Sequence, residues 1–106
     1  MRVLFDQGAP NPLRHALPAH AVSTAYEMGW AQLKNGDLLA AAEGAFDVFV
    51  TTDQNLRHQQ NLVGRSLAIL VLTTTSWPVI RADVGRVVAA LEAIQPGQYV
   101  ELSFNP

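Results

Sequence analysis

The most constraining feature of this chain is an unbroken apolar run at residues 67–72. Six consecutive apolar side chains predict a strand that is buried on both faces, which is typical of a parallel sheet covered by helices on its two sides. Shorter apolar runs predict the other strands, at residues 3–5, 21–24, 46–51 and 99–104. In the last of these, apolar and polar side chains alternate, which indicates a half-exposed strand at an edge of the sheet.

Helical patterns separate the predicted strands. We expect helices at residues 10–17, 38–45 and 78–94, a turn at 35–36, and a short helix or polar loop at 54–61. This alternation predicts an α/β fold with a mostly parallel central sheet. A length of 106 residues suits one domain, so we expect residues 1–106 to fold as a single unit.

Composition excludes several classes of function. The chain has no cysteine, so disulfides, thiolate metal sites and a cysteine nucleophile are excluded. A net charge of −2 leaves no large basic field for binding nucleic acid by charge alone. We see no signal peptide and no apolar run long enough to span a bilayer, so we expect a cytoplasmic protein without a membrane partner.

Acidic residues follow two of the predicted strands. Asp6 is the first polar residue after residues 3–5, and Asp53 is the first charged residue after residues 46–51. The carboxyl ends of parallel strands share one edge of the sheet, and ligands bind there. If the two strands are neighbours, these carboxylates can converge, and Asp37 at a helix start could supply a third.

Clustered carboxylates favour a hard divalent cation. Mg²⁺ and Mn²⁺ prefer oxygen ligands, and such an ion can support phosphodiester hydrolysis. Asn55 and Gln7 are neutral oxygen donors beside the two acids. The competing interpretation is that these aspartates only cap the helices that follow them.

Five segments carry a family resemblance, at residues 4–10, 27–30, 33–39, 46–56 and 59–62. The most specific stretches are Asn-Gly-Asp-Leu-Leu at 35–39 and Thr-Thr-Asp-Gln-Asn-Leu at 51–56. In this order they resemble the small PIN-like domains of bacterial proteins, a family described as the toxin or nuclease component of toxin–antitoxin modules. The resemblance covers residues 1–75 and continues more weakly to the end.

The resemblance implies a PIN-like three-layer α/β/α fold, an Mg²⁺- or Mn²⁺-dependent endoribonuclease activity, an RNA substrate and an antitoxin partner. It matches Asp6 to the acid after the first strand, Asp37 to the acid on a helix and Asp53 to the acid of the Thr-x-Asp motif. These three would be catalytic and metal-binding, with Asn55 as a further metal ligand.

Two positions depart from the family pattern. Gln7 stands where many relatives have an acid, and Asn55 stands where many have a second acid after the Thr-x-Asp motif. Both departures remove negative charge from the site. They favour an alternative hypothesis, in which the chain is a catalytically degenerate PIN-like module that acts through a protein partner.

Other polar residues are candidates for substrate contacts. We assign this role to Gln7, Lys34, Arg57, His58 and Gln60, although a solvated surface role competes for each. Tyr26 and Trp30 could stack on a base, but packing is the stronger interpretation. The surfaces around residues 28–30 and Trp77 could form a homodimer or antitoxin interface. A phospho-acceptor domain is disfavoured, since Lys34 is the only lysine and does not follow the fifth strand.

Overall fold

Five strands form one sheet in the computed structural model, which describes residues 1–59, 62 and 64–104, except for the side chains of residues 58 and 59. The strands are β1 (Arg2–Phe5), β2 (Ala21–Thr24), β3 (Val48–Thr51), β4 (Ala68–Leu72) and β5 (Tyr99–Leu102). The helices are the 3₁₀ helix η1 (Asn11–Ala16), α1 (Asn35–Ala42), α2 (Leu56–Gln59), α3 (Trp77–Ala82) and α4 (Val84–Ala93). The expected alternation of strands and helices is confirmed.

The sheet is entirely parallel and has the strand order β2-β1-β3-β4-β5. From β1 the chain moves outward to β2, and then returns to the other side of β1 to form β3. The strand order therefore reverses between β1 and β3, which is the position where open α/β sheets bind ligands at the carboxyl ends of their strands. β1 and β3, the strands that precede Asp6 and Asp53, are therefore neighbours, as the predicted site requires.

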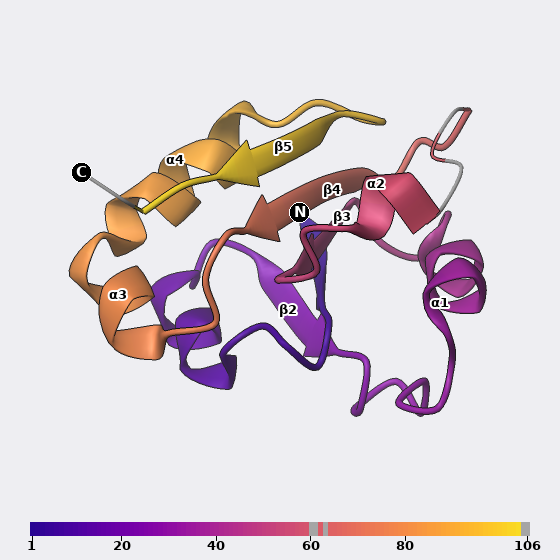
Figure 1. Ribbon diagram of the computed structural model, residues 1–106, viewed down its shortest axis with the longest axis horizontal. Coiled ribbons are helices and arrows are strands. Elements are labelled where there is room, and N and C mark those ends of the chain that lie inside the picture. The colour runs from indigo at the N-terminus through magenta and orange to yellow at the C-terminus, as the bar shows by residue number, and fades with distance from the viewer. Residues whose placement is uncertain (60–61, 63, 105–106) are drawn as a thin grey trace.

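Alternate side chains of the strands face two separate cores. Val3, Phe5, Val50 and Leu70 pack on one face with η1, α3 and α4. On the other face, Leu4, Phe49 and Ile69 pack with α1 and α2, and Figure 1 shows these helices on opposite sides of the sheet. The molecule is thus a three-layer α/β/α domain, and the unbroken apolar run of β4 is explained by burial on both faces.

Two predicted helical segments differ from the structure. Residues 35–36 do not form a turn but begin α1, which ends at Ala42 and not at residue 45. Small and polar residues are tolerated there because the first N–H groups of a helix have no intrahelical partner. The long helix expected at 78–94 is two helices, broken at Asp83, whose φ of −138° and ψ of 39° are not helical.

The break at Asp83 leaves the apolar stripe intact. Ile80 of α3 and Val87 and Leu91 of α4 are all buried in the same core, so periodicity alone could not reveal the break. None of the helices in the described ranges has both the length and the apolar character that a membrane span needs.

Candidate functional site

Asp6 and Asp53 lie at the carboxyl edge of the sheet and are connected through one side chain. The hydroxyl of Thr51, the last residue of β3, donates to Oδ2 of Asp6 at 2.9 Å. The same hydroxyl oxygen accepts the backbone N–H of Asp53 at 3.1 Å. Thr51 is completely buried, whereas the two aspartates are half-buried. A buried hydroxyl therefore fixes the positions of both acidic residues relative to the strands.

Further hydrogen bonds orient the two carboxylates. Asp6 Oδ1 accepts the backbone N–H of Gln7 at 2.8 Å. Asp53 Oδ1 accepts the backbone N–H of Asn55 at 3.0 Å, and Asp53 Oδ2 accepts the side-chain amide of Asn35 at 3.0 Å. Asn35 is the first residue of α1, so the carboxylate of Asp53 connects the end of β3 to the start of α1.

The predicted cluster of three aspartates is not formed. Asp37 lies in the first turn of α1 and is exposed. Among the described residues, no group of three or more His, Cys, Asp or Glu side chains is placed to hold a metal ion. The amide of Asn35, two residues before Asp37, is the α1 side chain that contacts Asp53. Asp6 and Asp53 are the acids that the structure connects, through Thr51.

Gln7 and Gly8 shape the loop after β1. The side-chain amide of Gln7 donates to the carbonyl of Ala31 at 2.9 Å, which ties this loop to the segment before α1. A Cβ at Gly8 would collide with the hydroxyl of Thr52. Glycine therefore permits the close approach of the loops that follow β1 and β3.

The other predicted substrate contacts are distributed around the site. Lys34 is exposed and precedes the first residue of α1. Arg57 of α2 lies 3.8 Å from a carboxylate oxygen of Glu101 and 5.5 Å from the ring centre of Tyr99, so its charge faces β5. His58 belongs to α2, but its side chain is outside the described part, and Gln60 is outside it entirely.

A cleft of about 520 Å³ adjoins Asp6 and Gln7. Its walls include Arg14 of η1 and the turn after β2 that carries Tyr26 and Glu27. This volume is within the usual range for ligand pockets. The cleft could not be predicted from sequence, because its walls come from segments that are far apart in the chain.

The turn after β2 is held by reciprocal hydrogen bonds. The backbone N–H of Thr24 donates to Glu27 Oε1 at 2.9 Å, and the backbone N–H of Glu27 donates to the Thr24 hydroxyl at 3.1 Å. This is a capping box, and its Thr-x-x-Glu spacing is visible in the sequence. Arg14 pairs with Glu27 Oε2 at 3.0 Å. The Arg14 hydrogen bond, followed by that of Thr24, lowers the pKa of Glu27.

Trp30 follows the same turn and packs inward. The centres of the Trp30 and Phe46 rings lie 6.0 Å apart in an edge-on arrangement. Trp30 is packed against the core beneath α1 and α2. Trp77 packs in the same way against the core on the opposite face. For Trp30, the interpretation as a packing residue is confirmed.

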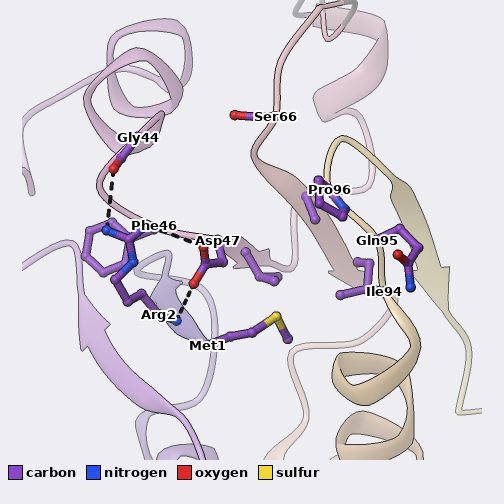
Figure 2. A pocket seen from close by; sticks show the side chains of 11 residues that line it. Met1, Arg2, Gly44, Phe46, Asp47, Ser66, Ile94, Gln95 and Pro96 are labelled. Carbon is purple, nitrogen blue, oxygen red and sulfur yellow. Dashed lines mark hydrogen bonds and ion pairs between the residues drawn. The ribbon is translucent and has the colours of Figure 1, made fainter.

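A second hollow, of about 450 Å³, lies at the opposite edge of the sheet, where β1, β3 and β4 begin. Figure 2 shows the Arg2 side chain between the Gly44 carbonyl and the carboxylate of Asp47. The backbone N–H of Arg2 also donates to Asp47 at 2.7 Å. These bonds join the first strand to the segment before β3, so Arg2 and Asp47 make structural contacts in this hollow.

Comparisons of the chain with protein-family models, with curated proteins and with solved structures found no significant match. The resemblance to PIN-like domains therefore stays a prediction.

Proposed function

We propose that this chain is a metal-dependent endoribonuclease of the PIN-like kind whose ion is held by Asp6 and Asp53. The observation that carries the proposal is the pair of half-buried aspartates bound to one buried hydroxyl, Asp6 through its carboxylate and Asp53 through its backbone N–H, at the point where the strand order reverses. This is the usual ligand position of an open α/β sheet.

The donor set of this pair is compatible with Mg²⁺ or Mn²⁺. Each carboxylate oxygen of Asp6 and Asp53 accepts one of the hydrogen bonds described above, whereas a carboxylate offers about four lone-pair sites. Mg²⁺ in proteins is held by one or two carboxylates together with waters and substrate phosphates. Two acids therefore suffice. Asn55 follows Asp53 by two residues, and Asp37 follows by two residues the Asn35 that contacts Asp53, so both are candidates for contacts through water.

A bound ion would activate water and stabilise negative charge on the scissile phosphate. The role of the chain is to keep the two carboxylates in place before substrate arrives. Thr51 orients Asp6 and the backbone of Asp53, and Asn35 orients the carboxylate of Asp53. Lys34, at the start of α1, is the cation proposed to meet substrate phosphate.

The test is cleavage of a labelled single-stranded RNA by purified protein in Mn²⁺ or Mg²⁺. We expect cleavage by the wild type, and a loss of cleavage in Asp6→Asn and Asp53→Asn. Asp83→Asn, at the break between α3 and α4, is the matched control and should cleave normally. The proposal is wrong if the wild type leaves RNA intact with both metals, or if Asp53→Asn cleaves as well as the wild type.

A specific observation favours the alternative, a degenerate module that acts through a protein partner. The amide of Asn35 donates to the carboxylate of Asp53, and the described residues contain no third acid positioned with the pair. This hypothesis predicts no heat of Mn²⁺ binding in calorimetry, together with a partner that still binds Asp53→Asn. Metal binding that depends on Asp53 would contradict it.

The proposal extends to the cellular context that the resemblance implies. A ribonuclease toxin that acts on cytoplasmic RNA needs an antitoxin to restrain it. Expression of the wild type should therefore inhibit growth, and expression of Asp53→Asn should not. Equal growth at equal protein levels would contradict the toxin role.

A further inference from the structure

Tyr26 is an exposed aromatic residue on a rigid turn at the cleft beside Asp6. Tyr26 is one of the residues that line the cleft, and it is 79% exposed. Large hydrophobic side chains are usually exposed only in part, and an aromatic ring in a cleft is a common ligand contact. The ring is therefore available to a molecule that enters the cleft.

The backbone that carries Tyr26 is restrained on both sides. The capping box of Thr24 and Glu27 encloses it, and Arg14 connects Glu27 to η1. The carbonyl of Tyr26 accepts the N–H of Gly29 at 3.0 Å, and Gly29 has a φ of 76°, which suits glycine. Little backbone entropy is lost when a rigid turn binds a ligand, so this geometry favours stacking on the ring.

The charges of the cleft select against a phosphate inside it. Arg14 is paired with Glu27 at 3.0 Å and also donates to the carbonyl of Val22 at 2.7 Å. The described residues that line the cleft include three charged ones, Asp6, Arg14 and Glu27. Because Arg14 and Glu27 pair with each other, the carboxylate of Asp6 has no oppositely charged partner among them. A phosphate there would be repelled, whereas a neutral heteroaromatic ring would not.

We propose that the cleft is a nucleobase subsite, in which one base of a single-stranded RNA stacks on Tyr26. The adjoining phosphate then lies outside the cleft, at the carboxyl edge of the sheet. This inference rests on the proposed function, because it supplies the substrate contact beside the two carboxylates. Stacking tolerates any base, so the subsite positions RNA without reading its sequence.

The test is binding of a fluorescein-labelled six-nucleotide oligoadenylate, measured by anisotropy in EDTA so that no cleavage occurs. Stacking of one base contributes about 1–3 kcal/mol. We therefore expect Tyr26→Ala to weaken binding by about 5- to 150-fold, and Tyr26→Phe to stay within about twofold of the wild type. The matched control is Met28→Ala, on the same turn and outside the cleft lining, which should bind normally.

A second probe separates stacking from other effects. An oligonucleotide with abasic positions should bind wild type and Tyr26→Ala equally weakly. The subsite is contradicted if Tyr26→Ala binds oligoadenylate as wild type does, or if removing the bases changes nothing. It is also contradicted if Tyr26 is needed only for binding a protein partner. RNA binding through Tyr26 without cleavage in Mn²⁺ would contradict the proposed nuclease while supporting the subsite.

Discussion

At the scale of single residues, the carboxyl edge depends on Thr51. Its buried hydroxyl both donates to Asp6 and accepts from the backbone of Asp53. A threonine at the end of a parallel strand is not unusual in sequence, because β-branched residues favour strands. Its role appears only when the strand order brings β1 beside β3.

The first prediction concerns this hydroxyl. Thr51→Val keeps the shape of the side chain but leaves Asp6 and the N–H of Asp53 without their partner, so we expect the free energy of unfolding to fall by about 1–3 kcal/mol. Thr51→Ser keeps the hydroxyl and loses one buried methyl group, which costs about 0.8 kcal/mol. Urea denaturation measures both variants. If Thr51→Val were as stable as wild type, the hydroxyl would have no such role.

The second prediction concerns the close approach at Gly8. Gly8→Ala places a Cβ against the hydroxyl of Thr52 and should destabilise the protein by about 1–3 kcal/mol. Thr52→Ala removes that hydroxyl, so the double variant should recover most of the loss. A double-mutant cycle from denaturation curves checks the coupling. Additive effects of the two substitutions would show that the collision does not occur.

At the scale of elements, strands were easier to predict than helix ends. The strand at 21–24 matches β2, and those at 3–5, 46–51 and 67–72 match their strands within two residues at each end. Buried strands show in the sequence as apolar runs, because both faces are covered. Helix ends depend on backbone angles at single residues such as Asp83, and a continuous apolar stripe hides them.

The third prediction concerns the packing of α4. Leu91 is buried against the sheet, so Leu91→Ala should lower the free energy of unfolding by about 2–5 kcal/mol. Glu92→Ala, on the exposed side of the same helix, is the matched control and should change it by less than about 0.5 kcal/mol. Thermal or urea unfolding distinguishes the two. A small effect of Leu91→Ala would mean that α4 is not docked as described.

At the scale of the whole molecule, three carboxylates join segments that are distant in sequence. Glu43, after α1, accepts the backbone N–H groups of Ser66 and Leu67 at 2.8 and 3.1 Å, as well as the Ser66 hydroxyl. Asp47 is bound to Arg2, and Glu27 to Arg14. The hydrogen bond from Ser66 lowers the pKa of Glu43, and the backbone N–H of Arg2 lowers that of Asp47.

The fourth prediction follows from these pKa directions. A carboxyl whose pKa is lower in the folded state than in the unfolded state stabilises the fold above its ordinary pKa, which is 4.5 for Glu43. That stability is lost as the pH falls through the folded value. Urea midpoints between pH 7 and pH 3 should therefore decline below about pH 5. Glu43→Gln should flatten the decline, whereas Glu92→Gln should not; equal curves would contradict this.

The site could be predicted from sequence only in part. Asp6 and Asp53 were found because an acid after a buried strand must lie at the carboxyl edge. The prediction that Asp37 completes a cluster of three acids was wrong. The start of α1 places the amide of Asn35, and not the carboxylate of Asp37, against Asp53. The sequence named Tyr26 as a residue that could stack on a base, but its place at a cleft and the Arg14–Glu27 pair required the fold, because the cleft joins η1 to the turn after β2.

The central claim is that Asp6 and Asp53 together hold one divalent ion. Calorimetric titration of the wild type with Mn²⁺ tests it most directly, with Asp6→Asn, Asp53→Asn and Asp37→Asn measured alongside. We predict that the wild type binds Mn²⁺, that Asp6→Asn and Asp53→Asn each weaken binding by about tenfold or more, and that Asp37→Asn weakens it less. Absence of Mn²⁺ binding by the wild type, or unchanged binding by Asp53→Asn, would contradict the claim.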